Sequence, residues 1–95
     1  MDMDKEFLQA NPGWCCYLLC CADDTLYCGI TNDLTKRLAA HNAGTAAKYT
    51  RARGPVELAY VESCEDKSAA LKREMAIKAL PRAAKLALIV TYGVK

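Results

Sequence analysis

The sequence predicts a small α+β domain, an antiparallel sheet covered by helices, with the element order β-β-α-β-α-α. Two observations lead to this prediction: an apolar hairpin pattern in the first third of the chain, and helical periodicity afterwards, interrupted by one alternating stretch. With 95 residues, of which 53% are hydrophobic, the chain can bury one modest core. We therefore expect residues 1–95 to form a single domain.

Three strands are predicted from two apolar runs and one alternating run. Residues 14–21 and 26–31 flank a turn at residues 22–24, which is typical of a β-hairpin. Residues 56–61 alternate well enough to form a third strand. Residues 1–13 are polar and end in Asn-Pro-Gly, which predicts a loop.

The first helix is delimited by a capping residue and a glycine. Asn32 or Asp33 can cap a helix over residues 34–42, because their short side chains accept hydrogen bonds from the first turn. Gly44 ends this helix. Residues 45–55 are small and basic, and they predict a loop or a short helical turn.

Two more helices follow the third strand. Asp66 or Ser68 opens a helix that runs to about Leu80. Pro81 stops that helix or starts the next one, because proline is tolerated only in a first helical turn. Residues 82–90 have the pattern of a final helix.

Charge is distributed along the chain in bands. The formal net charge is only +2, yet residues 32–55 and 67–85 are rich in lysine and arginine, and residues 1–31 and 56–66 in aspartate and glutamate. Two basic bands on a nearly neutral chain indicate a face that binds a polyanion. Solvated helix faces would produce the same pattern.

The six cysteines do not have the spacing of a zinc site. Neighbouring residues of a strand point to opposite faces, so each adjacent pair is split, and no C-x-x-C pair is present. We interpret them as small buried hydrophobes, which suits a reducing cytoplasm. The cysteines are Cys15, Cys16, Cys20, Cys21, Cys28 and Cys64.

The chain has no feature that predicts secretion or a membrane span. It begins MDMDKEF, which is acidic where a secretory signal is basic. The apolar runs at residues 14–22 and in LALIV are too short to cross a bilayer. We expect a cytoplasmic protein without a membrane partner.

The hairpin places two tyrosines beside a glycine. If its loop has an odd number of residues, Tyr17 and Tyr27 fall on one face with Gly29 and Thr31. Together the two tyrosines and the glycine would form a shallow surface that carries hydroxyls. For either tyrosine taken alone, we expect instead that the ring packs and only its hydroxyl reaches solvent. The other face is expected to point to the core and comprises Cys16, Leu18, Cys20, Leu26, Cys28 and Ile30.

The first helix carries two polar residues on its apolar side. Leu34, Arg37, Leu38 and His41 fall within an arc of about 100°. Burying the polar groups of Arg37 and His41 is costly without partners, so they need a tyrosine, a carboxylate or a bound phosphate. The alternative is that both side chains extend outward to solvent.

Glu74 is the only acidic residue in the second basic band. It can pair with Lys78 one turn later, in the favoured order of glutamate before lysine. It can equally serve as a ligand of Mg²⁺, which binds few protein oxygens and keeps several waters. The spacing alone leaves both interpretations open.

These residues together resemble the GIY-YIG endonuclease family, and are most similar to its small standalone bacterial members, over roughly residues 13–85. The signature appears in degenerate form as Cys15-Cys16-Tyr17 and Tyr27-Cys28-Gly29. The stretch GITNDLTKRLAAHNAG looks like the glycine, cap and Arg-x-x-x-His helix of the family. AKYT resembles its basic-aromatic segment, and ALKREMAIK resembles the helix with its metal-binding glutamate.

The resemblance implies a three-stranded antiparallel sheet flanked by helices, and hydrolysis of a nucleic-acid phosphodiester with one divalent ion, Mg²⁺, which Mn²⁺ can replace. DNA is expected as the substrate ahead of RNA, and the sequence leaves both open. By position, Tyr17 and Tyr27 match the signature tyrosines, Arg37 the catalytic arginine and His41 the histidine one turn later. Glu74 matches the metal ligand. Lys48 and Tyr49 match less closely.

The roles that follow are expectations. A phosphodiester must approach Gly29, where a side chain would block it, and Arg37 can hold a phosphate oxygen. Cations, including a protonated His41, would favour the phenolate of the tyrosine that activates water. Tyr17 is the preferred base, although its role and that of Tyr27 can be exchanged, and His41 can instead relay the proton.

Further basic residues are expected to contact phosphates without reading sequence, which predicts weak sequence preference. They are Lys36, Lys48, Arg51 and Arg53. The resemblance to structure-specific members of the family implies a preference for branched, nicked or single-stranded ends. Two other functions compete with a nuclease: an inactive nucleic-acid-binding module on the same fold, and a cysteine-based redox or metal protein.

Overall fold

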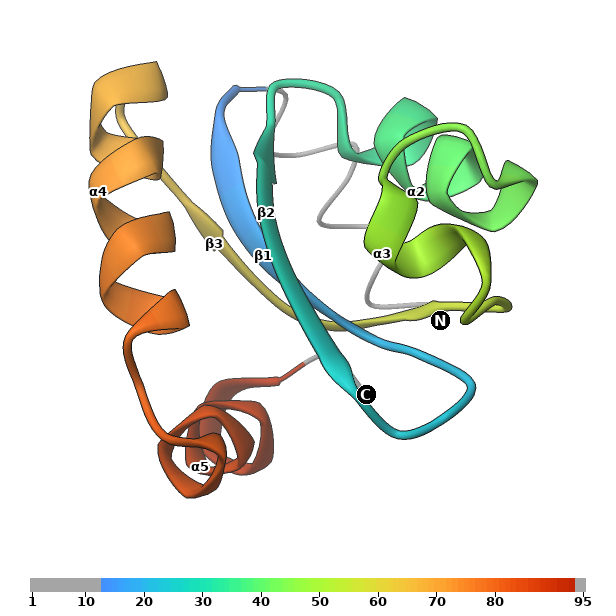
Figure 1. Cartoon of the computed structure of the whole chain (residues 1–95). Helices are drawn as coiled ribbons and strands as arrows, with labels where there is room; N and C mark the ends of the chain where they lie inside the picture. The colour runs from blue at the N-terminus through green and yellow to red at the C-terminus, as the bar shows by residue number, and fades with distance from the viewer. Residues whose placement is uncertain (1–12, 94–95) are drawn as a thin grey trace, which may run out of the picture.

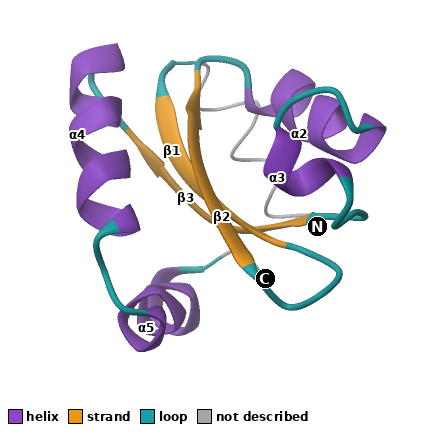
Figure 2. Cartoon of the chain, viewed as in Figure 1, coloured by secondary structure: helices purple, strands orange, loops and turns teal. Residues whose placement is uncertain are grey.

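A computed structural model of the chain describes residues 13–93, so the loop predicted at residues 1–13 lies outside it except for Gly13. The elements confirm the predicted order (Figures 1 and 2). They are β1 (Cys15–Cys20), β2 (Leu26–Thr31), α2 (Leu34–Ala43), α3 (Lys48–Arg51), β3 (Glu57–Ser63), α4 (Lys67–Lys78) and α5 (Arg82–Tyr92). The segment at residues 45–55, predicted as a loop or a short helical turn, contains one short helix, α3.

The three strands form one antiparallel sheet in the order β2-β1-β3, which leaves β2 at an edge. The hairpin loop comprises residues 21–25 rather than 22–24, and Asp24 in it adopts a left-handed conformation with φ 64°. The loop count remains odd, so Tyr17 lies opposite Gly29 and on the same face as Tyr27, as predicted.

Helices cover both faces of the sheet. α2 and α3 lie on one side, and α4 and α5 on the other (Figure 1). The face of the tyrosines is therefore not the shallow surface that the sequence predicts. It carries a hydrophobic core of its own, in which Tyr17 and Leu19 pack with Leu34 of α2. The opposite face packs Leu18 and Cys28 against Ile77 of α4.

The caps explain where the helices begin and end. The side chain of Asp33, not Asn32, caps α2 by accepting a hydrogen bond from the Lys36 backbone N–H at 3.1 Å. Gly44 ends α2 with φ 80°, a conformation that glycine adopts without steric cost. Asp66, not Ser68, caps α4 through the Ala69 N–H at 2.8 Å.

The six cysteines are free thiols, four of them buried, which agrees with the expectation that they act as small hydrophobes. Cys15 and Cys16 belong to the cores on opposite faces of the sheet. Between residues 13 and 93 no cluster of three or more His, Cys, Asp or Glu residues is arranged to hold a metal ion. Within the same part of the chain, none of the helices has the length and apolarity needed to cross a membrane.

Candidate active site

Three buried side chains form a hydrogen-bonded chain beneath α2. Tyr17 Oη lies 2.9 Å from His41 Nε2, and His41 Nδ1 lies 2.8 Å from Thr50 Oγ1. Tyr17 and His41 are each 2% exposed and Thr50 is 0% exposed. β1, α2 and α3 therefore each supply one member. The predicted need of His41 for a polar partner is met by a tyrosine, and its side chain does not extend to solvent.

Gly29 is a glycine because the Tyr17 ring lies across it. A Cβ atom at Gly29 would stand 2.6 Å from Tyr17 Oη and 2.7 Å from Cζ, and 3.1 Å from Cε2 of Tyr27. Contacts this short require the buried ring to move. The close approach that the sequence indicates at this position is thus accounted for by a side chain of the protein itself.

Burial determines the protonation states of Tyr17 and His41. It raises the pKa of Tyr17, an effect that the charge of neighbouring Tyr27 reinforces and Arg37 opposes. Burial, and then the charge of Arg37, lower the pKa of His41 below its usual 6.5. Tyr17 is therefore a neutral phenol and His41 a neutral imidazole at pH 7. A phenolate at Tyr17 and a protonated His41 were expected, and both pKa shifts run in the opposite direction. The reason is that this face of the sheet is packed in a core and not exposed as a surface.

Tyr27 and Tyr49 extend this cluster toward solvent. The Tyr27 ring lies 5.1 Å from the His41 ring and 5.8 Å from the Tyr49 ring, centroid to centroid. Arg53 stacks over Tyr49 at 4.0 Å, and its Nε lies 3.1 Å from a carboxylate oxygen of Asp23. Arg53, predicted to contact phosphate, thus also fixes α3 to the hairpin loop.

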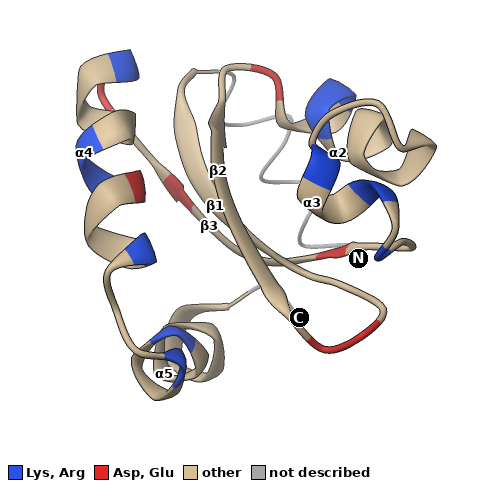
Figure 3. Ribbon diagram, viewed as in Figure 1, with Lys and Arg blue, Asp and Glu red and all other residues tan. Residues whose placement is uncertain are grey.

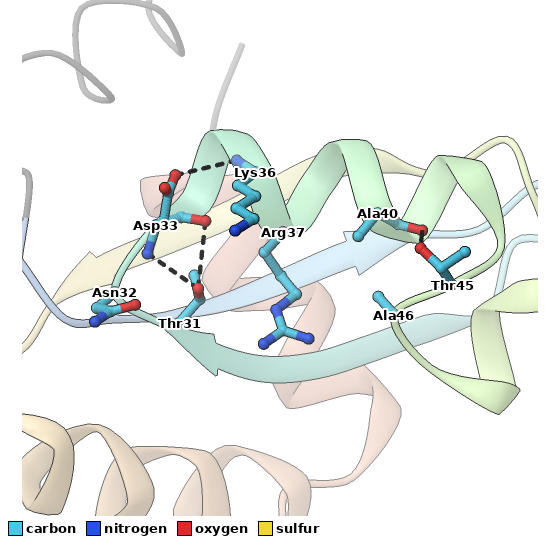
Figure 4. Close-up of a pocket in the computed structure, with 8 residues that line it drawn as sticks. All are labelled: Thr31, Asn32, Asp33, Lys36, Arg37, Ala40, Thr45 and Ala46. Carbon is cyan, nitrogen blue, oxygen red and sulfur yellow. Dashed lines mark hydrogen bonds between the residues drawn. The ribbon is translucent and has the colours of Figure 1, made fainter.

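Arg37 lines an open pocket of about 370 Å³ between the end of β2, α2 and the loop that follows it. Figure 4 shows its guanidinium extending from α2 toward β2. Lys36 lines the same pocket, and neither side chain forms a hydrogen bond or ion pair with another of residues 13–93. The pocket therefore offers positive charge that is available to an anion. Its other lining residues are Thr31, Asn32, Asp33, Ala40, Thr45 and Ala46.

Glu74 lies on α4, on the other side of the sheet from Tyr17 and His41. Its Oε2 lies 3.5 Å from Lys78 Nζ, so the ion pair suggested by the spacing is formed. Its negative charge also opposes ionisation of Cys28 on β2, although the hydrogen bond with Cys16 lowers the pKa of that thiol on balance. Glu74 thus faces β2 and does not join the tyrosine cluster.

The two basic bands lie on opposite sides of the sheet. Figure 3 shows lysine and arginine on α2 and α3 at one side and on α4 at the other. Lys48 and Arg51 are exposed on α3, and no side chain among the described residues pairs with them. The charges therefore flank the edge strand β2 instead of forming one continuous face.

Sequence reasoning missed Thr50. Its segment, AKYT, was singled out for Lys48 and Tyr49, which carry charge and an aromatic ring. A lone threonine in a four-residue helix has no periodic signal, because only folding brings it to a histidine nine positions earlier. The hydroxyl directly after a basic-aromatic pair was the only available signal.

Comparison with known proteins matches the chain to a family. The profile of the GIY-YIG catalytic domain matches residues 13–87. UPF0213 proteins of Lactiplantibacillus plantarum and Clostridium perfringens are 54% and 53% identical to the chain over 81 and 79 residues. Each alignment covers 83% of this chain, and 80% and 85% of the respective relatives.

A solved structure is also similar. The solution NMR structure of a UPF0213 protein from Bacillus halodurans has a TM-score of 0.53 and 36% sequence identity, covering 81% of this chain and 82% of that one. Its fold supports the arrangement of sheet and helices described above. The match of the domain profile to most of the chain, and relatives more than half identical, establish the relationship. This chain belongs to the GIY-YIG nuclease family.

Proposed function

We propose that this protein is an endonuclease that hydrolyses phosphodiester bonds of DNA, with Mg²⁺ as its cofactor and Mn²⁺ as a substitute. The observation that carries the proposal is the guanidinium of Arg37, which pairs with no side chain in the described part of the chain and lies close to the buried Tyr17–His41 hydrogen bond. A guanidinium holds phosphate oxygens through its forked donors. The phenol and the neutral imidazole next to it can move a proton.

The hydrogen-bonded pair suits activation of water. In the proposed reaction, a water oxygen forms a bond to phosphorus, and the bond to the leaving oxygen breaks with its electron pair going to that oxygen. Tyr17 Oη takes the proton of the water as it passes its own proton to His41 Nε2, 2.9 Å away. Because the proton moves on, the raised pKa of Tyr17 is no obstacle. Tyr27 is then the tyrosine that contacts the phosphate.

Glu74 is the residue that would hold the metal. Mg²⁺ commonly binds one or two carboxylates together with substrate phosphates and keeps several waters, so one half-buried carboxylate fits it. When bound, Mg²⁺ stabilises the negative charge that develops on the phosphate and the leaving oxygen. Since Arg37 and Glu74 approach β2 from opposite faces, the scissile phosphate must lie across the edge of this strand, near Gly29.

Exposed cations at the edge would bind the nucleic-acid backbone. Lys36, Lys48 and Arg51 are exposed and form no ion pair with a described residue. Phosphate contacts of this kind position a substrate without reading its bases. We therefore propose weak sequence preference and a preference for DNA whose backbone can bend across an edge, such as branched, nicked or single-stranded ends.

The test is cleavage of labelled single-stranded, duplex, nicked and branched DNA and RNA by the purified protein in Mg²⁺ or Mn²⁺, beside Glu74→Ala. Lys72→Ala, which removes an exposed charge from the same helix, is the matched control. The proposal predicts cleavage by the parent and the control, and loss in Glu74→Ala. Salt-sensitive binding of every substrate without cleavage would instead identify a nucleic-acid-binding module on this fold.

A further inference from the structure

Thr50 carries a fully buried hydroxyl, which is costly unless the hydroxyl is hydrogen-bonded. Its side chain is 0% exposed, and Oγ1 lies 2.8 Å from His41 Nδ1. Oγ1 also donates a hydrogen bond to the Ala47 carbonyl oxygen at 3.3 Å, within the turn that begins α3. The position of this turn is fixed, because Arg53 donates to the Tyr49 carbonyl at 2.9 Å and to Asp23 at 3.1 Å.

The number of available protons defines the direction of each hydrogen bond. A hydroxyl has one proton, and the Ala47 carbonyl oxygen, which can only accept, lies 3.3 Å from Thr50 Oγ1 to receive it. With its proton directed to that carbonyl, Thr50 Oγ1 accepts from His41 Nδ1, 2.8 Å away, and Nδ1 carries the ring proton of the neutral imidazole. His41 Nε2 is then left with a lone pair, and it accepts the hydrogen bond from Tyr17 Oη.

We propose that Thr50 is a positioning residue that holds His41 in the tautomer protonated on Nδ1, so that Nε2 faces Tyr17 as a proton acceptor. This role rests on the proposed function, because Tyr17 must lose its proton for the reaction to proceed. With the other tautomer, Nε2–H would point at Tyr17 and His41 could take no proton from it. Thr50 thus contributes through His41 and touches neither substrate nor metal.

The direct measurement is the tautomer of His41, read from ¹H–¹⁵N correlations between the carbon-bound ring protons and the two ring nitrogens. The chain contains one histidine, so the signals are unambiguous. We compare the full-length parent with Thr50→Val, which keeps the shape but loses the hydroxyl, and Thr50→Ser, which keeps the hydroxyl. Amide spectra show that each variant is folded. No nucleic acid is needed, so the result stands apart from whether the protein cleaves.

The proposal predicts a proton on Nδ1 in the parent and in Thr50→Ser, and a shift to Nε2–H or to a mixture in Thr50→Val. On a cleaved substrate, Thr50→Val should lose about 10²-fold in rate, the order expected when a proton acceptor is lost, and Thr50→Ser should restore it. A parent protonated on Nε2, or a folded Thr50→Val with an unchanged tautomer, overturns the proposal. If the parent cleaves nothing, the proposed nuclease fails while the tautomer still decides the placement of the proton.

Discussion

At the scale of single residues, the site depends on a polar group buried between two partners. His41 bridges Tyr17 and Thr50 inside a core that otherwise holds apolar side chains. Buried polar groups are tolerated only when they are hydrogen-bonded, and here each ring nitrogen has a partner. The arrangement requires that the Tyr17 ring have room, which Gly29 provides.

Gly29→Ala should therefore disturb the site from the neighbouring strand. Its Cβ would lie 2.6 Å from Tyr17 Oη, so the ring must shift and the bond to His41 is strained or lost. We expect a loss of about 1–3 kcal/mol in the free energy of unfolding, as for other overpacked cores, measured by urea denaturation. Gly13→Ala is the control, because no atom of a described residue, apart from its chain neighbours, lies within 4 Å of its added Cβ. Equal stability of the two variants would contradict the packing described here.

The lowered pKa of His41 predicts an acid-sensitive fold. Below pH 6.5, the usual pKa of histidine, the unfolded chain binds a proton that the folded protein does not, so stability falls as the pH falls toward the lowered pKa. The limiting slope for one proton is about 1.4 kcal/mol per pH unit. Chemical denaturation between pH 7 and pH 5 should thus show a steeper loss in the parent than in His41→Gln. Parallel curves would mean that His41 titrates equally in both states.

At the scale of elements, α4 carries both a candidate ligand and its competitor. Lys78 Nζ lies 3.5 Å from Glu74 Oε2. A partly exposed pair of this kind contributes about 0.3–0.5 kcal/mol to stability, so neither residue is needed for folding. The ion pair and metal binding are alternative uses of one carboxylate.

Removing Lys78, which competes with Mg²⁺ for the carboxylate of Glu74, should favour binding of the metal. In Lys78→Ala, a unit charge 3.5 Å from the carboxylate oxygen is lost, which in water is worth about 1 kcal/mol. We expect the Mg²⁺ concentration for half-maximal cleavage to fall about five-fold, read from a Mg²⁺ titration. Lys72→Ala on the same helix should leave it unchanged. If Lys78→Ala also leaves it unchanged, Glu74 serves only as an ion-pair partner.

The basic residues in and directly after α3 are expected to have two different roles. Lys48 and Arg51 are exposed and unpaired among residues 13–93, whereas Arg53 is bound to Asp23 and to Tyr49. Replacing Lys48 or Arg51 by alanine should reduce the slope of log affinity against log salt by about 1 for each phosphate contact removed, measured by fluorescence anisotropy with labelled DNA. Arg53→Ala should chiefly lower thermal stability. An unchanged slope in the first two variants would remove them from the interface.

At the scale of the whole molecule, local patterns predicted the elements, and long-range packing decided the site. The bounds of β2 and the shared face of Tyr17 and Tyr27 follow from strand alternation and an odd loop, both of which are local. The burial of Tyr17 does not, because it depends on packing against Leu34 and Leu38 of α2 and against Leu58 of β3, which are far from it in the sequence. Its predicted surface exposure, and with it the direction of its pKa, were wrong for this reason.

Glu74 likewise shows the difference between what local sequence patterns predict and what long-range packing decides. A helical wheel shows that it lies near the apolar side of α4, but the sequence does not tell which face of the sheet α4 covers. The structure places α4 opposite α2, so the candidate ligand and Arg37 flank the edge strand β2. A substrate phosphate near Gly29 would be the only group that both could share.

The rate of Mg²⁺-dependent cleavage under single-turnover conditions tests this account most directly, in the parent, Arg37→Ala, Glu74→Ala and the control Lys72→Ala. We predict that the parent and the control cleave at similar rates, and that each of the other two variants loses about 10²-fold or more. Arg37→Ala removes a positive charge that stabilises the transition state, and Glu74→Ala removes the proposed ligand of the Mg²⁺ that does the same. Their folds should be unchanged, since Arg37 is exposed and Glu74 is half-buried, and neither belongs to the two hydrophobic cores. Cleavage by Arg37→Ala and Glu74→Ala at the parental rate would contradict the account.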